Sequence, residues 1–184
     1  MQRIETSLPG VCVIEPKVFG DVRGYFYESY HRERFAQLGI GDLFVQDNCS
    51  YSLGGVLRGL HYQLRHPQAK LCRVAQGEVF DVAVDIRRGS PTFGQWTGVI
   101  LSGENKRQIY IPSGFAHGFA VISESAEFVY KCSDFYHPED EQGIAWNDPQ
   151  VGIAWPLADP RLSEKDKKYL FLEQTDPALL PVYR

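Results

Sequence analysis

The stretch Val79–Ile86, with the sequence VFDVAVDI, decides how the rest of the chain is interpreted. Apolar side chains stand at every second position from Phe80 onward, and Asp81 and Asp85 fall between them. Successive side chains of an extended strand point to opposite faces of its sheet, so this alternation is typical of a half-buried β-strand. We therefore expect a strand here, with both carboxylates on the face opposite the apolar residues.

Similar short runs follow along the middle of the chain, separated by turn-forming residues. They are Trp96–Leu101, Gln108–Ile111 and Glu127–Lys131. Many short strands with regular turns are typical of an antiparallel sandwich or barrel. The sequence thus predicts an all-β fold.

Few segments have helical character. Arg32–Leu38 followed by Gly39 predicts a short helix that ends at a glycine, and Ser163–Leu170 predicts another that begins at Ser163. The segment Asn147–Arg161 contains three prolines and is expected to form a surface arm.

Length and charge limit the function classes. The chain has 184 residues, of which 43% are hydrophobic, and we expect one domain over residues 1–184. Nineteen basic and 23 acidic side chains give a net charge of −4 with no basic block, which argues against nucleic acid as a partner.

Neither a signal peptide nor an apolar stretch of membrane-spanning length is visible. The four cysteines form no C-x-x-C pair, which argues against a zinc knuckle. We expect a cytoplasmic protein with reduced thiols, not bound to a membrane.

Two motifs suggest a polar cavity. GVLRGLHYQ (Gly55–Gln63) and IPSGFAHGF (Ile111–Phe119) have spacings that resemble the two cupin motifs. Metal-binding cupins end the first motif with a second histidine, where this chain has Gln63. His66 stands out of register. Because an amide oxygen is a weak, neutral ligand, we expect no bound metal. A cupin barrel without metal still has a cavity lined by polar side chains.

Seven blocks resemble, in order, those of the dTDP-4-dehydrorhamnose 3,5-epimerase family. They are EPKVFGDVRGYFYESY (Glu15–Tyr30), FVQDNCS (Phe44–Ser50), VLRGLHYQL (Val56–Leu64), GEVFDVAVDIRRGSPTFGQW (Gly77–Trp96), LSGENKRQIYIPSGFAHGF (Leu101–Phe119), AEFVYKCSDFYHP (Ala126–Pro138) and LSEKD (Leu162–Asp166). The resemblance implies a cupin-type jelly-roll barrel with an N-terminal strand and short C-terminal helices packed on it. It also implies a homodimer that inverts C3 and C5 of dTDP-4-dehydro-6-deoxy-D-glucose without cofactor or metal, in dTDP-L-rhamnose biosynthesis.

Proton transfer beside a ketone needs a base, a stabilised enolate and an acid on the opposite face. His61 is the candidate base, since histidine titrates near ~6.5 and is available in its neutral form. Lys70 is the candidate cation for the enolate oxygen, and Tyr130 is the candidate acid. By resemblance, Asp166 orients His61.

Each of these residues also has a structural interpretation. His61 alone is typical of a hydrogen-bonded core histidine, and Lys70 and Tyr130 of ordinary strand positions. Ser163 and Asp166 are spaced like a helix capping box. Tyr136 is a rival to Tyr130 as the acid, and either of the two is a candidate to stack on the base instead.

A nucleotide diphosphate needs fixed positive charge and hydrogen-bond donors. The predicted substrate-binding residues are Arg23, Glu28, Gln46, Asn48, Arg58, Asp81, His117 and Tyr136. Strict alternation would point Arg58 away from His61, and we predict a β-bulge at Gly59 that returns both side chains to the cavity.

Three alternatives stay open: an epimerase of one carbon only, a metal-dependent cupin, and a non-catalytic sugar-nucleotide binding protein. The strand around Val11–Ile14 is predicted to be an edge that pairs with, or is exchanged with, another subunit.

Overall fold

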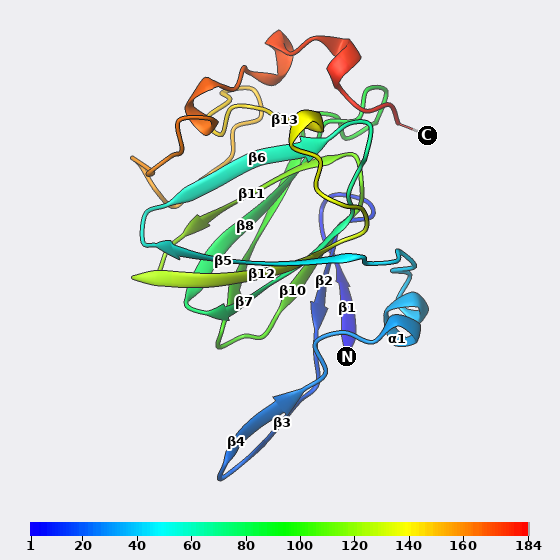
Figure 1. The fold of residues 1–184 in the computed structure, drawn as a ribbon, viewed down its shortest axis with the longest axis vertical. Helices are drawn as coiled ribbons and strands as arrows, with labels where there is room; N and C mark the ends of the chain where they lie inside the picture. Colours follow the sequence, from blue (N-terminus) through cyan, green and yellow to red (C-terminus); the bar gives the residue numbers. More distant parts are fainter. Residues whose placement is uncertain (184) are drawn as a thin grey trace.

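The computed structural model describes residues 1–183 and contains two main antiparallel sheets that face each other (Figure 1). The six-stranded sheet has the order β1 (Gln2–Glu5), β2 (Cys12–Glu15), β10 (Gln108–Ile111), β7 (Lys70–Gln76), β12 (Ser125–Cys132), β5 (Gln46–Leu53). The five-stranded sheet has the order β13 (Glu141–Gly143), β6 (Leu57–Gln63), β11 (Phe115–Val121), β8 (Glu78–Asp85), β9 (Trp96–Ser102). This architecture confirms the predicted all-β, cupin-type fold.

Strand β8 is buried on both faces, where the sequence predicted burial on one. Val79 and Ala83 face the interior between the sheets, and Val82 and Val84 belong to a second core on the outer face. The second core includes Val151, Leu172 and Leu180, because the C-terminal segment packs over the outside of the five-stranded sheet (Figure 1). The two carboxylates of the strand lie on the inner face and are fully buried.

The helical predictions had different outcomes. Helix α1 (Arg32–Gln37) forms as expected and is followed by Gly39 at φ +81°. The predicted helix Ser163–Leu170 is wrong, because only a 3₁₀ turn, η2 (Asp166–Lys168), forms there before Tyr169 becomes extended. The backbone of the next residue accepts a hydrogen bond from Ala145 N instead of continuing a helix. The other 3₁₀ turns are η1 (Pro138–Asp140), η3 (Leu172–Gln174) and η4 (Pro177–Leu179).

The predicted bulge at Gly59 is confirmed. His61 pairs with His117, but Arg58 pairs with Phe119, so β6 has one residue more than β11 between these pairs. Gly59 has φ +125°, and a Cβ there would lie 2.6 Å from the Cα of the facing strand. Only glycine fits this close approach. The bulge lets Arg58 and His61 both line the cavity.

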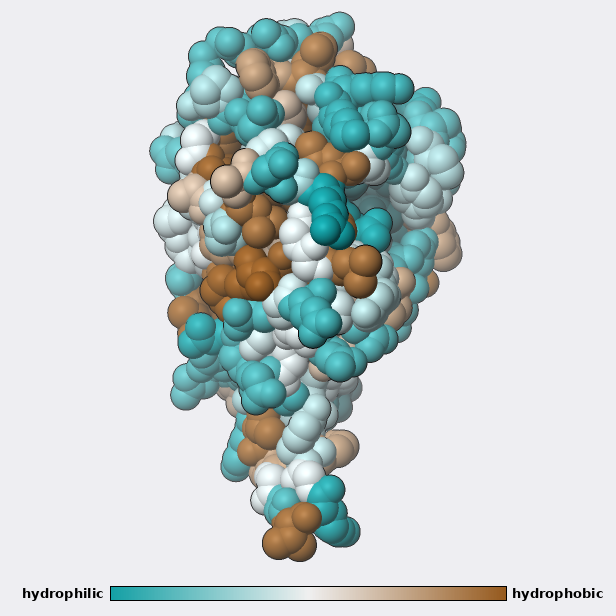
Figure 2. All heavy atoms as spheres, turned by 90° about the vertical axis from the view of Figure 1, so that its left-hand side faces the viewer, coloured by the Kyte–Doolittle hydropathy of each residue, from teal (hydrophilic) through white to brown (hydrophobic). Residues whose placement is uncertain are grey.

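A hairpin of β3 (Val18–Asp21) and β4 (Gly24–Tyr27) projects from the barrel (Figures 1 and 2). Within residues 1–183 its two strands pair only with each other. The prediction of an edge at Val11–Ile14 is wrong, because β2 lies between β1 and β10 and the edge is β1. No helix in the described part of the chain has the length and apolarity to cross a membrane.

Candidate active site

A cavity of about 690 Å³ lies between the two sheets. Its walls come from β5, β7 and β12 on one side and from β6, β11 and β13 on the other, and residues 161–166 close one end. The structure places the four residues that the sequence analysis assigned to catalysis in these walls. They are His61, Lys70, Tyr130 and Asp166.

His61 is held from the C-terminal side by Asp166. Its Nε2 lies 2.6 Å from Asp166 Oδ1, and the carboxylate is only 3% exposed. Burial alone would raise the pKa of Asp166, but the hydrogen bonds from His61 and Ser163 outweigh it and lower that pKa. Ser163 Oγ accepts a 3.1 Å bond from Asp166 N, so the capping interaction and the pairing with His61 occur together.

The other imidazole nitrogen faces Glu141, a residue that the sequence analysis missed. Glu141 Oε1 lies 3.8 Å from His61 Nδ1 and 2.5 Å from Lys165 Nζ. Burial would raise the pKa of Glu141, but Lys165 and the Tyr136 hydroxyl stabilise the carboxylate and lower it. Lys165 was visible beside Asp166 in the LSEKD block, whereas Glu141 falls outside every block with a recognisable pattern.

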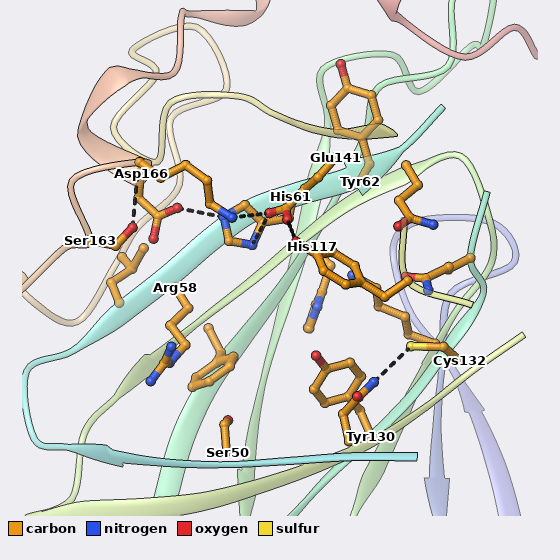
Figure 3. A pocket seen from close by; sticks show the side chains of 18 of the residues that line it. Ser50, Arg58, His61, Tyr62, His117, Tyr130, Cys132, Glu141, Ser163 and Asp166 are labelled. Carbon is orange, nitrogen blue, oxygen red and sulfur yellow. Dashed lines mark hydrogen bonds and ion pairs between the residues drawn. The ribbon is translucent and has the colours of Figure 1, made fainter. Parts of the chain in front are cut away.

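Tyr130 projects into the cavity from the sheet opposite His61 (Figure 3). Burial raises its pKa to about 12, so the phenol is protonated at neutral pH. In the hydrogen bonds of residues 1–183 its hydroxyl has no partner, whereas the Tyr136 hydroxyl donates to Glu141. The geometry therefore distinguishes the two tyrosines, because only Tyr130 has its proton free to face a ligand.

Lys70 begins β7, between Ile111 of β10 and Cys132 of β12. It lines the cavity on the same sheet as Tyr130. Across the described chain it forms no ion pair, so its ammonium group is not neutralised by a protein carboxylate. A fixed cation in a partly dry cavity stabilises negative charge on a bound oxygen.

His117 and Asp81 form a buried pair beneath the cavity. His117 Nε2 lies 3.1 and 3.0 Å from the two Asp81 carboxylate oxygens, and neither side chain is more than 8% exposed. Burial lowers the pKa of His117, although the nearby carboxylate opposes this effect. His117 lines the cavity, and Asp81 lies behind it and fixes its orientation.

Four more of the predicted substrate-binding residues line the cavity: Gln46, Asn48, Arg58 and Tyr136. Gln46 Nε2 donates to Asn48 Oδ1 at 2.9 Å, and Tyr136 N donates to Gln46 Oε1 at 2.9 Å. Arg58 Nε donates to Ser52 Oγ at 3.0 Å, which leaves the terminal nitrogens of the guanidinium group for a ligand.

Arg23 and Glu28 lie away from the cavity of their own chain. Arg23 is in the turn of the β3–β4 hairpin, where its side chain is 85% exposed and pairs with Asp21. Glu28 follows β4 and pairs with Arg34 of α1 at 3.0 Å.

Gln63 stands at the position of the second cupin histidine, and its side-chain amide is hydrogen-bonded to backbone groups. Its Nε2 donates to the carbonyls of His66 at 2.7 Å and Phe135 at 3.1 Å, and its Oε1 accepts from His137 N at 2.7 Å. The amide joins the loop that carries His66 to the loop that carries Phe135 and His137, and both its nitrogen and its oxygen are hydrogen-bonded.

Comparison with known proteins identifies the relatives of this chain. Residues 5–174 match the family model described as dTDP-4-dehydrorhamnose 3,5-epimerase. The dTDP-4-dehydrorhamnose 3,5-epimerase of Pseudomonas aeruginosa is 60% identical over 170 residues, which are 91% of this chain and 94% of that protein. The enzyme of the same name from Methanothermobacter thermautotrophicus is 51% identical and covers 98% of this chain and 96% of its own.

Solved structures agree with the sequence comparison. The dTDP-6-deoxy-D-glucose-3,5-epimerase of Legionella pneumophila, in complex with dTDP-4-keto-L-rhamnose, superposes with a TM-score of 0.97. It is 58% identical and covers 100% of this chain and 98% of its own. A 3'-monoepimerase from Streptomyces bikiniensis, in complex with dTDP-quinovose, has a TM-score of 0.92 at 36% identity, with 98% and 93% coverage.

Proposed function

Because the chain belongs to the dTDP-4-dehydrorhamnose 3,5-epimerase family, we infer that it inverts C3 and C5 of dTDP-4-dehydro-6-deoxy-D-glucose. The product is dTDP-4-dehydro-L-rhamnose, and the reaction belongs to dTDP-L-rhamnose biosynthesis. Both carbons flank the C4 ketone, so each inversion is a proton abstraction followed by a proton return on the other face. The observation that carries this conclusion is the placement of His61 and Tyr130 on opposite walls of one cavity (Figure 3).

His61 is the base in this proposal, and Nδ1 is the atom that takes the proton. The ionised Asp166 carboxylate contacts Nε2, so Nε2 carries the hydrogen and the lone pair of Nδ1 remains free. Asp166 also stabilises the imidazolium that forms after abstraction.

Residues on the opposite wall of the cavity carry out the remaining steps. Lys70 stabilises the enolate oxygen at C4, because its ammonium group has no protein counterion in the described chain and faces the cavity. The neutral phenol of Tyr130 returns a proton on the face opposite His61. The residues therefore supply the base, the enolate stabiliser and the acid without a cofactor or metal.

The nucleotide and sugar are bound by the polar residues of the same cavity. Arg58 suits a phosphate, because its planar guanidinium group donates two parallel hydrogen bonds. Gln46 and Asn48, with the Tyr136 ring, are assigned to the sugar or the base. His117 is assigned to the phosphates or the sugar, and Asp81, which accepts the hydrogen of His117 Nε2, keeps it in place.

The test is proton NMR of the dTDP-sugar with the enzyme in deuterated water. Each abstraction exchanges a carbon-bound hydrogen for deuterium, so both the C3 and the C5 signals should disappear. His61→Asn is the matched control and should preserve both signals. Retention of one signal with the native enzyme would favour a single-carbon epimerase like the Streptomyces bikiniensis relative. Retention of both, with tight binding, would favour the non-catalytic binding protein.

We also propose a cytoplasmic homodimer. The four cysteines are free thiols, which suits a reducing compartment. The β3–β4 hairpin exposes Val18, Phe19, Val22 and Phe26, with Val22 fully exposed, and Figure 2 shows hydrophobic atoms at its tip. An exposed apolar surface of this kind is typical of a protein interface. The proposal places the hairpin, with Arg23 and Glu28, at the cavity of a second copy.

Mixing experiments test this arrangement. Arg23→Ala and His61→Asn chains are each expected to be weakly active or inactive alone, and to regain activity when refolded together. The mixed dimer then has one cavity with an intact His61 and an Arg23 from the other chain. If Arg23 served its own cavity, no mixture would regain activity. Charged substitutions at the facing pair Phe19 and Phe26 should yield monomers in light scattering.

A further inference from the structure

The ring of Tyr169 packs against the ring of His61. Their centroids are 5.7 Å apart and the planes meet at 67°, an edge-to-face arrangement. Aromatic pairs in this arrangement prefer a defined orientation. None of the hydrogen bonds of residues 1–183 involves the Tyr169 hydroxyl. The contact is therefore made by the ring, not by the polar atom.

Gly143 makes room for this ring. It is the Cα partner of His61 across the β13–β6 pair. A Cβ built at Gly143 would lie 2.5 Å from two carbons of the Tyr169 ring and 2.7 Å from a third. The backbone of Gly143 is not in the left-handed region, so the Tyr169 ring is what a side chain would meet.

The segment that carries Tyr169 is fixed at both ends. Three residues before it, Asp166 contacts His61 Nε2. One residue after it, the Leu170 carbonyl accepts a 2.9 Å hydrogen bond from Ala145 N. One short segment thus contacts the imidazole twice, through a carboxylate at one nitrogen and through a ring at one side.

We propose that Tyr169 and Gly143 form a positioning pair that fixes the plane of the His61 ring for proton abstraction. This inference rests on the function proposed above. An imidazole held at one nitrogen can still rotate about that hydrogen bond, and the Tyr169 ring blocks the rotation. A misplacement of about 1 Å in a catalytic group costs on the order of 10²-fold in rate. Tyr169 acts through His61 and is not assigned a contact with the substrate.

Three single variants and one double variant test the pair. Tyr169→Phe keeps the ring and should preserve kcat within about twofold, because only the hydroxyl is lost. Tyr169→Ala should lower kcat about tenfold, and Gly143→Ala about 10- to 100-fold, with little change in KM. Gly41→Ala is the matched control, because nothing lies within 4 Å of a Cβ there. It should behave as the native enzyme does.

The double variant Gly143→Ala/Tyr169→Ala gives the decisive result. The alanine at 143 harms the enzyme only through the Tyr169 ring, so the double variant should be no worse than Tyr169→Ala alone. It should therefore be faster than Gly143→Ala alone. A double variant as slow as the product of the two single effects would overturn the proposal, as would native kcat in Tyr169→Ala.

A measurement without turnover separates this proposal from the proposed function. Nitrogen-15 NMR of the imidazole should show His61 in one tautomer, protonated at Nε2, in the native enzyme and in Tyr169→Phe. Tyr169→Ala and Gly143→Ala should shift its ring signals, while thermal unfolding stays cooperative. Unchanged His61 signals in both variants would refute the positioning pair even if the substrate differed. Absence of C3 and C5 exchange in the native enzyme, with these shifts present, would refute only the function.

Discussion

His61 Nε2 and Asp166 Oδ1 meet at 2.6 Å, although 105 positions separate the two residues in the chain. One belongs to a strand of the barrel, and the other to a 3₁₀ turn of the C-terminal segment. The pair fixes which imidazole nitrogen faces the cavity and, in the proposed mechanism, the direction from which a substrate proton is removed.

Replacing the Asp166 carboxylate should show whether it orients His61 or only stabilises the local fold. We expect Asp166→Asn to lower kcat by about 10²–10⁴-fold, because an amide no longer holds the proton on Nε2 or stabilises the imidazolium. KM should change little, since the Asp166 carboxylate is only 3% exposed and is bonded to His61. Rates of deuterium incorporation at C3 and C5 measure the effect. An Asn variant with native exchange rates would show that the carboxylate only caps the turn begun by Ser163.

The two tyrosines should differ in their importance. Tyr130→Phe should lower kcat by about 10²–10⁴-fold, since among the described tyrosines that line the cavity its hydroxyl alone has no protein partner. Tyr136→Phe should reduce kcat less, because its hydroxyl is already bonded to Glu141. With the Tyr130 pKa at about 12, ionisation of this phenol should cause no loss of activity below about pH 10. Steady-state kinetics of both variants measure these effects. A larger loss of kcat in Tyr136→Phe than in Tyr130→Phe would make Tyr136 the acid.

Gln63→Glu tests the link between the two entrance loops. The carboxylate would face the carbonyls of His66 and Phe135, which now accept hydrogen bonds from the amide. We expect the loop that carries Tyr136 to shift and KM to rise about tenfold, with a smaller change in kcat. The exposed residue Gln37 offers a control, and Gln37→Glu should leave KM unchanged. Equal KM values in the two variants would refute the link.

Asp85 should make stability depend on acid pH. Burial would raise its pKa, but hydrogen bonds from Arg87, Ser90 and Thr92 outweigh it, so the pKa lies below its ordinary value of about 3.9. A depressed pKa gives a stabilisation that is complete above about pH 4 and is lost as the pH falls through the folded-state value.

Asp85→Asn should therefore cost about 3–5 kcal/mol at pH 7, because it leaves Arg87 without its buried partner. The difference in Tm between native and variant protein should shrink as the pH falls from 4 toward 2. Thermal unfolding monitored by circular dichroism measures both quantities. A difference that is constant with pH would show that the charge of Asp85 is not stabilising.

Local patterns located four strands of the two main sheets, β8, β9, β10 and β12, and indicated the fold class. Alternation located β8 and β10 to within a residue or two, and the glycine in β6 correctly indicated a bulge. The same reasoning failed at Ser163–Leu170, where the sequence predicted a helix. The segment forms only a 3₁₀ turn there, because it then becomes extended and Leu170 O accepts a hydrogen bond from Ala145 N, next to β13. It also underestimated the burial of β8, since its outer cover comes from residues about 70 or more positions away.

The site was predictable only where the chemistry lies in a motif. His61 lies in the first cupin-like motif, and the roles of Lys70 and Tyr130 came from the family resemblance of the blocks around them. Glu141 reaches the imidazole only because β13 pairs with β6, and no local signal reports that pairing. Tyr169 had no predicted role for the same reason, because its contact with His61 depends on the missing side chain at Gly143.

The C-terminal segment has a consequence for how the enzyme is made and lost. During translation, strands β1–β13 are all synthesised before Asp166 and Tyr169, so a nascent chain with every barrel strand still lacks the two groups that we propose orient His61. A protease that cuts in the arm before residue 161 would break the covalent link between the barrel strands and the segment that carries Asp166 and Tyr169. In the proposed mechanism, activity therefore requires that the C-terminal segment is both synthesised and packed against β6 and β13.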